Sequence, residues 1–320
     1  KYFCAAQSGA CLRSGFPVLA WIVLLTAVFS LSGCGGGGSQ SQSGSGEVVI
    51  SLTDAEGDFA TYTVDVVSIK LTRVDGTEVE TLPLATRIDF AEYTEIAEFL
   101  TAATVPNGRY VKGSMVLDYS NADIRVEDSN GDAQPATAVV DSEGNPLARL
   151  EVNVVLEGRS ALPVAPGIPR NLLLDFDLEQ SNSVVFAGGE VTVTVAPVLI
   201  AEVDPQAPKV HRLRGPLQSV NVTENRFRLF IRPFFHPIRT GPRQFGSLAV
   251  QTGDETFYEI DGIAYQGAPG LAVLDTLPQF AAVVARGNLR FDPLRFEARE
   301  VYAGSSVPGG AMDAVRGSVV

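Results

Sequence analysis

The chain has 320 residues, 45% of them hydrophobic, and a formal net charge of −13 at pH 7, so it can bury a sizeable core and two domains are expected. Its only histidines are His211 and His236, a number that excludes histidine-rich zinc sites and most Ser-His-Asp arrangements. The sequence contains no phosphate-binding glycine loop, nucleophile elbow or HExxH motif, and it therefore favours a non-catalytic protein.

Residues 1–33 have the organisation of a lipoprotein signal peptide. Lys1 and Arg13 supply a basic start, residues 16–31 carry no charge, and Leu31-Ser32-Gly33-Cys34 forms a lipobox. A transmembrane helix needs about 20 apolar residues, and this run is shorter and ends in small residues. We therefore expect cleavage before Cys34. The alternative is a short N-terminal anchor that is never cleaved.

Cleavage would leave Cys34 as the first residue, with a lipid on its thiol. Cys4 and Cys11 fall in the removed segment, so no thiol would remain for a disulfide, a metal or a nucleophile. Bacterial lipoproteins, which this segment resembles, are sorted by the residue after the cysteine, and Gly35 is not the aspartate that favours inner-membrane retention. The expected location is the bacterial cell envelope, at the outer membrane.

Residues 34–46 combine the lipidated cysteine with a tether rich in glycine and serine. A flexible chain of this length spans roughly 20 Å on average. We expect the tether to keep the folded part clear of the bilayer without orienting it.

Charge divides the rest of the chain. Residues 47–204 contain 27 acidic and 9 basic side chains, whereas residues 205–320 contain 10 acidic and 13 basic ones. We predict an acidic domain over 47–204, a linker at 205–208 and a second domain over 209–304. Residues 305–320 are predicted to be a linker and the start of a further repeat, because 316–320 repeat the pattern of 214–218. Nucleic acid is not an expected partner, because its phosphates need basic surfaces.

The acidic domain consists almost entirely of predicted strands. The apolar positions in 62–73 change phase between Val66 and Val67, which predicts a β-bulge, and Asp75-Gly76 predicts a hairpin turn. Alternating patterns predict further half-buried strands. The expected strands are 48–52, 62–73, 78–82, 109–118, 136–140, 148–156, 172–178, 184–186 and 190–203.

One helix is predicted between these strands, over residues 90–103. Its apolar side chains, beginning with Phe90 and Tyr93, repeat at helical spacing, and Glu92, Glu95 and Glu98 are expected to face away from the core. Many short strands with one helix indicate a mainly β fold, in which the N-terminal domain is a β-sandwich.

Three stretches of the acidic domain resemble a known bacterial lipoprotein family. They are 51–58, 106–110 and 172–178, which read SLTDAEGD, PNGRY and LLLDFDL. They are similar to the signature stretches of the family catalogued as domain of unknown function four-three-eight-two. The resemblance implies a sandwich similar to transthyretin or to carbohydrate-binding modules, held on a lipid anchor. It implies no catalytic residue.

Two acidic loops are candidate cation sites. Asp128, Asn130 and Asp132 lie in the first, and Asp141 and Glu143 lie in the second. Calcium prefers such oxygen ligands, but the glycine spacing does not match the twelve-residue helical calcium loop. The alternative is that both loops simply turn hairpins, and turn chemistry alone accounts for their residues. A further acidic set, formed by Asp54, Asp58, Asp175 and Asp177, is expected to cap turns and strand ends.

The second domain is predicted to be a small β-barrel or open roll. Its expected strands are 213–221, 226–232, 247–251, 256–260, 281–287, 289–291 and 295–301. Patterns at 214–220, 254–258, 284–287 and 296–301 resemble a second uncharacterised bacterial domain that is often repeated. An insertion at about 232–246 departs from the spacing of that domain.

The insertion and the strand before it form a candidate ligand or docking surface. We expect Phe227, Leu229 and Ile231 to point inward. The outward residues and the loop that follows combine basic and aromatic side chains, namely Arg226, Arg228, Phe230, Arg232, Phe234, Phe235, Arg239 and Arg243. Such a surface can grip anionic sugars or phosphates. The alternative is docking of the arginines onto an acidic surface while the phenylalanines fill a core.

These features favour a lipid-anchored, extracytoplasmic binding or structural module, with envelope or extracellular polysaccharide or another envelope protein as its partner. Two alternatives remain open. The chain could supply accessory N-terminal modules to a larger glycan-processing enzyme, or it could be part of an adhesin or stalk built of β repeats.

Overall fold

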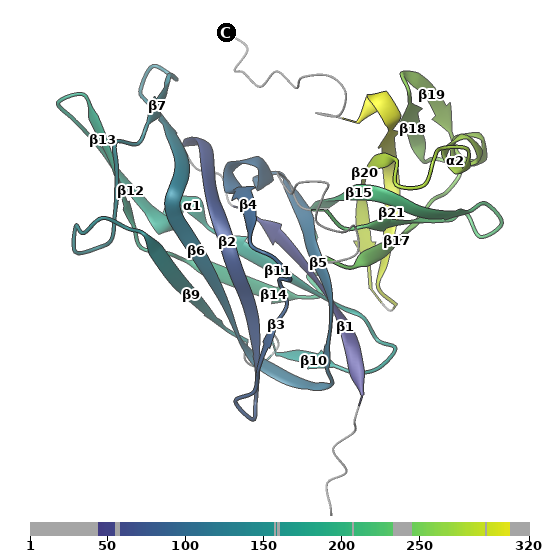
Figure 1. The fold of residues 1–320 in the computed structure, drawn as a ribbon, viewed down its shortest axis with the longest axis horizontal. Helices are drawn as coiled ribbons and strands as arrows, with labels where there is room; N and C mark the ends of the chain where they lie inside the picture. The colour runs from purple at the N-terminus through teal and green to yellow at the C-terminus, as the bar shows by residue number, and fades with distance from the viewer. Residues whose placement is uncertain are drawn as a thin grey trace, which may run out of the picture. The chain divides into compact units, whose positions relative to one another are not determined.

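The computed structural model describes residues 44–54, 58–156, 158, 161–206, 208–232, 245–291 and 293–307. The fold is mainly β, with 63% strand in several sheets, one of which curls into a half-barrel, and the predicted fold class is confirmed. Figure 1 shows the strands and the short helices between them. Among the described residues, no helix has both the length and the apolarity that a membrane span requires.

The largest sheet has eleven strands among the described residues and contains residues from both predicted domains. In spatial order its main path is β14 (Leu199–Val203), β11 (Arg170–Phe176), β1 (Ser45–Thr53), β5 (Ile96–Pro106), β15 (Val210–Asn221), β16 (Arg226–Phe230), β17 (Ser247–Gln251), β21 (Arg295–Ala303), β18 (Phe257–Ile260) and β19 (Ile263–Gln266), and β20 (Ala282–Arg290) pairs with β15 and β21. Strand β5 pairs with β15 in parallel, from Ile96 opposite Val210 to Glu98 opposite Arg212. The predicted linker at 205–208 therefore lies between two strands of one continuous sheet.

Within the described residues, two smaller sheets and four short helical segments accompany the largest sheet. The seven-stranded sheet contains β10 (Leu162–Val164), β6 (Gly108–Glu127), β2 (Phe59–Arg73), β3 (Glu78–Glu80), β4 (Thr86–Asp89), β7 (Ala133–Pro135) and β9 (Arg149–Val155). The three-stranded sheet contains β12 (Asn182–Ala187), β13 (Glu190–Val195) and β8 (Ala138–Val140). The helical segments are α1 (Leu178–Ser181), α2 (Ala268–Asp275) and the single 3₁₀ turns η1 (Phe90–Tyr93) and η3 (Gly304–Ser306).

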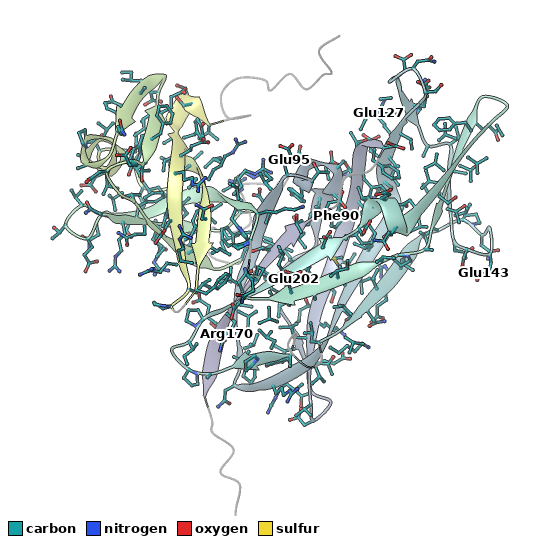
Figure 2. The ribbon with its side chains drawn as sticks, turned by 180° about the vertical axis from the view of Figure 1, so that it is seen from behind. Phe90, Glu95, Glu127, Glu143, Arg170 and Glu202 are labelled. Carbon is teal, nitrogen blue, oxygen red and sulfur yellow. The ribbon has the colours of Figure 1, made fainter. Side chains whose placement is uncertain are left out.

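The core forms where the strand patterns predict it. Side chains that alternate along β9 and β13 are buried, among them Val152, Val154, Val191 and Val193. In Figure 2, Phe90 lies inside the β structure, whereas Glu143 lies at the tip of a loop. The predicted bulge in β2 is confirmed, because its register against β6 shifts between Val66 and Ser68. The Asp75-Gly76 turn is confirmed by the pairing of β2 with β3.

The predicted helix over residues 90–103 is wrong. Only Phe90–Tyr93 turns, as η1, and the chain then continues into β5. Residues 97–101 are all buried, because β5 runs between β1 and β15 inside the largest sheet. A strand covered on both faces has a continuous apolar pattern that also satisfies helical spacing. Glu98, which was expected to face water, is 2% exposed.

Candidate functional site

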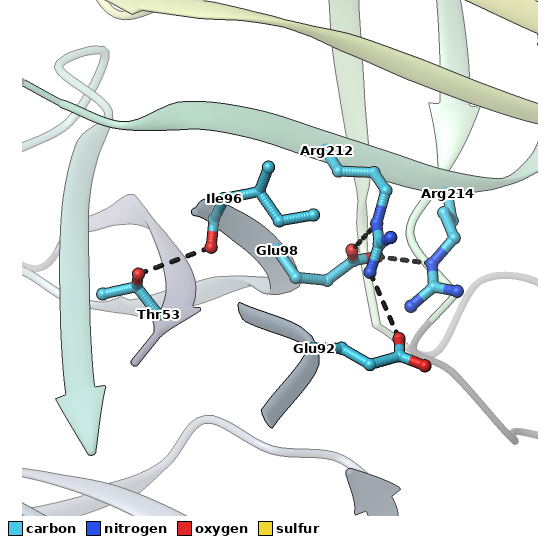
Figure 3. A network of polar contacts seen from close by, with 6 residues as sticks. All are labelled: Thr53, Glu92, Ile96, Glu98, Arg212 and Arg214. Atoms are coloured by element: carbon cyan, nitrogen blue, oxygen red, sulfur yellow. Dashed lines mark hydrogen bonds and ion pairs between the residues drawn. The ribbon is translucent and has the colours of Figure 1, made fainter. Parts of the chain in front are cut away.

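Glu98 is the centre of a buried ion cluster that joins β5 to β15 (Figure 3). Its carboxylate accepts a hydrogen bond from Nε of Arg212 and another, 2.7 Å long, from Nε of Arg214. Glu92, which lies in η1, has its Oε2 3.7 Å from Nη2 of Arg212. The two arginine side chains are each 13% exposed, so all these charges interact with little screening from water.

Arg212 keeps its charge although burial opposes it. Burial would lower the pKa of the guanidinium, but Glu98, with smaller contributions from Tyr93 and Glu92, raises that pKa above its usual value. The guanidinium carbon of Arg212 lies 5.9 Å from the centre of the Tyr93 ring, within cation–π range. Burial also raises the pKa of the Tyr93 hydroxyl, so Tyr93 remains neutral.

Lys209, just before β15, and His211 within it extend the same junction. Nζ of Lys209 donates hydrogen bonds of 2.7 Å to the carbonyl oxygens of Asp54 and Thr94. His211 is fully buried beside the Phe99 ring, and its Nδ1 lies 2.8 Å from the carbonyl oxygen of Lys209. Burial lowers the pKa of His211 to about 4, so its ring is neutral at physiological pH. Figure 3 also shows a hydrogen bond of 3.4 Å that Oγ1 of Thr53, at the end of β1, donates to the carbonyl oxygen of Ile96, at the start of β5.

Among the described residues of the predicted arginine surface, Arg226 faces solvent and Arg228 contacts the sheet. Arg226 is exposed and pairs with Glu224, while Nη1 of Arg228 donates a 3.2 Å hydrogen bond to Oγ of Ser247. Glu47 in β1 is exposed as a whole, but partial burial of its carboxylate raises its pKa. The positive charge of Arg228 opposes this rise. Arg228 therefore interacts electrostatically with Glu47 of β1.

Two further residues of this surface are half-buried or buried. Partial burial lowers the pKa of Arg232. Phe230 was predicted to point outward, and this is wrong, because it is 5% exposed and stacks on Phe280 with ring centres 6.2 Å apart. The inward prediction for Phe227, Leu229 and Ile231 is confirmed, since each is at most 1% exposed. The remaining candidates, Phe234, Phe235, Arg239 and Arg243, lie outside the described residues, as does Cys34.

The Phe280 ring adds an exposed aromatic group next to this surface. Phe280 is 47% exposed and its backbone has φ of 69°, a conformation that bulky residues rarely adopt. Its N–H donates a hydrogen bond to the carbonyl oxygen of Leu217, which fixes the turn before β20. Because strained backbone conformations cluster at functional sites, the Phe280 ring is a candidate ligand contact.

The two acidic loops adopt the same hairpin turn. Oδ1 of Asp128 accepts hydrogen bonds from the backbone N–H groups of Asn130 and Asp132, and Oδ1 of Asp141 accepts the same two bonds from Glu143 and Asn145. These bonds lower the pKa of both aspartates. The carboxylates of Asp128 and Asp141 thus stabilise their own turns by accepting backbone hydrogen bonds. Within the described ranges, no group of three or more histidine, cysteine or acidic side chains could hold a metal ion.

The prediction that the further acidic set caps turns and strand ends is confirmed for two members. Asp177 is the N-cap of α1, where its Oδ1 accepts a hydrogen bond from the N–H of Gln180. Asp54 is fully buried, and its Oδ1 accepts a 3.0 Å hydrogen bond from the N–H of Leu178. Its carboxylate therefore links the end of β1 to the start of α1.

Sequence reasoning did not single out Arg212 and Arg214. The available signal was their spacing, because side chains two residues apart on a strand lie on the same face. Two arginines on one face of a strand require acidic partners when that strand is buried. Glu98 was not recognised as the partner because it had been assigned to a helix surface.

Comparison with known proteins identifies part of the chain. Residues 45–197 match the family model described as "Domain of unknown function (DUF4382)", and they form a DUF4382 domain. No curated protein and no solved structure matches the chain. The match covers β1 to β13, so Glu92 and Glu98 belong to the family domain while Arg212 and Arg214 follow it.

Proposed function

With residues 45–197 assigned to the DUF4382 family, we propose that this chain is a non-catalytic lipoprotein of the bacterial outer membrane that binds envelope or extracellular polysaccharide. The observation that carries the anchor is the uncharged run 16–31, which ends in the lipobox Leu31-Ser32-Gly33-Cys34. The tether from Cys34 leads directly to β1, which begins at Ser45. This arrangement suits a folded body that is held at a membrane surface.

The binding role is supported by the basic and aromatic surface on β16 and its neighbours. The exposed Phe280 ring can stack on the apolar face of a sugar, and the nearby arginines, Arg228 and Arg232, can pair with carboxylate or phosphate groups. Acidic polysaccharide is the ligand class that uses both contacts.

The anchor is tested by metabolic labelling with palmitate. The wild-type protein should incorporate label and fractionate with membranes, and Cys34→Ala should lose both properties. Cys11→Ala is the matched control, because it removes a thiol from the segment expected to be cleaved and should leave labelling unchanged. Equal labelling of the Cys34→Ala and wild-type proteins would refute the anchor.

The binding role is tested on a glycan array with the mature protein. Phe280→Ala and the double variant Arg228→Glu with Arg232→Glu should each lose binding to acidic glycans. Phe186→Ala is the matched control, because Phe186 is 49% exposed, close to the 47% of Phe280, but lies on β12. If the control loses binding as much as Phe280→Ala, the ligand does not occupy the proposed surface.

A further inference from the structure

The tether enters the fold at one end of the β structure, between two turns. The carbonyl oxygen of Gly44 accepts a 2.9 Å hydrogen bond from the N–H of Asn107, in the turn between β5 and β6. A side chain at Gly44 would come within 2.9 Å of Cγ of Pro166, in the turn between β10 and β11. The last residues of the tether therefore lie against both turns.

A third turn belongs to the same end. It connects β2 to β3, and the N–H of its Val74 donates a 3.0 Å hydrogen bond to the carbonyl oxygen of Arg109 at the start of β6. Strand β10 pairs with that same start, with Pro163 opposite Arg109. Figure 1 shows the turn after β2, the start of β1 and strand β10 at one end of the molecule. The three turns and Gly44 together form the tethered end.

The tethered end exposes large apolar side chains at its tips. Val74 is 70% exposed and Ile168 is 51% exposed, and each belongs to a turn whose neighbouring residues are also exposed. Neither side chain is needed to fill the core, because the adjacent strands already bury Leu71, Leu162 and Val164. Exposed apolar side chains at the point where a chain is attached to a membrane suit contact with that membrane.

Basic side chains accompany these apolar tips. Arg73 flanks Val74 and Arg109 is exposed next to it, although residues 47–204 contain only 9 basic side chains against 27 acidic ones. Oδ2 of Asp75, in the same turn, lies 3.3 Å from Nη2 of Arg73. Arg109 is exposed to solvent. An anionic leaflet repels the acidic domain as a whole, and the exposed Arg109 favours the approach of this end to lipid phosphates.

We propose that the tethered end rests on the lipid surface, with Val74 and Ile168 at the boundary between headgroups and acyl chains and Arg109 among the phosphates. This inference rests on the proposed lipid anchor. It differs from the sequence-based expectation that the tether leaves the body unoriented. The contact involves few side chains and is weak by itself, but a tether of roughly 20 Å holds this end close to the bilayer at high effective concentration.

The test uses tryptophan as a reporter in the lipidated protein. The single tryptophan of the chain, Trp21, lies in the segment expected to be removed, so an introduced tryptophan reports alone. The lipidated Val74→Trp and Ile168→Trp proteins are each reconstituted with vesicles of phosphatidylethanolamine and phosphatidylglycerol. The matched control is Val185→Trp, because Val185 is 53% exposed but lies on β12, outside the tethered end. Quenching by brominated acyl chains and by acrylamide is measured on vesicles separated by flotation.

The tethered-end reporters should be quenched by brominated lipid and should be roughly twofold less sensitive to acrylamide than the control, because the interface excludes water. If the protein floats with the vesicles but all three reporters respond alike, the body does not rest on this end and the proposal is wrong while the anchor stands. If the protein does not float, the anchor itself is refuted, and the proposal with it. Val74→Asp with Ile168→Asp should abolish the protection of a reporter at Pro166→Trp, an exposed position of the same end, without changing flotation, and unchanged protection would contradict the proposal.

Discussion

Replacement of Glu98 by glutamine tests whether the buried ion cluster holds β5 to β15. Glu98→Gln keeps the shape of the side chain but removes the charge that both Arg212 and Arg214 contact. Loss of one partner from a buried pair costs about 3–5 kcal/mol of the free energy of unfolding, because the remaining charges stay desolvated. The arginine side chains are only 13% exposed, so water cannot replace the lost partner without local rearrangement. In a chain of this size such a loss lowers the melting temperature by roughly 10 °C.

The assay is urea denaturation of the mature protein followed by circular dichroism. Glu95→Gln is the matched control, because Glu95 lies three residues earlier, is exposed and loses the same charge. We expect the control to stay within about 0.5 kcal/mol of the wild type. Equal destabilisation by both variants would refute the reasoning, since it would show that total charge and not the buried contact sets the effect. A compensating variant, Glu98→Leu with Arg212→Met and Arg214→Met, should recover part of the lost stability, because apolar groups of similar volume carry no desolvation cost while Glu92 loses its contact with Arg212.

Two further predictions concern His211 and Gly270. The pKa of folded His211 is about 4, below its usual 6.5, so the unfolded state binds a proton first and the free energy of unfolding falls as pH drops from about 6.5 to 4. His211→Phe should reduce this acid destabilisation by on the order of 3 kcal/mol, and a variant with an unchanged pH dependence of urea unfolding would contradict a neutral buried ring. A Cβ at Gly270 would lie 2.2 Å from Cδ2 of buried Tyr258, so Gly270→Ala should cost about 1–3 kcal/mol in the same assay. Gly253→Ala, which meets nothing within 4 Å, is its control, and similar costs for both would show that contact with Tyr258 is not the cause.

Most strands of this protein could be predicted from sequence because their apolar side chains alternate. Along β9 and β13 one face is buried and the other is wet, and the sequence records that difference at every second residue. The bulge at Val66 was predictable for the same reason, since one extra residue reverses the alternation. The aspartates of the turns were also predictable, because their bonds go to backbone groups only a few residues away.

Strand β5 shows where this reasoning fails. It is covered on both faces over residues 97–101, so alternation disappears and an apolar run remains that fits a helix equally well. The error propagated to the candidate site, because a helix assignment placed Glu98 in water. The outward prediction for Phe230 failed for a related reason. The alternating pattern of β16 contains no information about Phe280, which lies 50 residues later in the sequence and covers the second face of the strand.

The buried charges of β15 carry information that hydrophobic patterns do not. A strand with arginines at two successive positions of one face either exposes that face or brings acidic residues with it, because an unpaired buried guanidinium is too costly. The arginine face of β15 is itself buried, because the side chains of Arg212 and Arg214 are each only 13% exposed, so the exposed alternative is excluded. An acidic partner on an adjacent strand is then required, and Glu98 meets that requirement only if residues 96–106 are a strand. The paired arginines thus constrain the conformation of a segment more than 100 residues away.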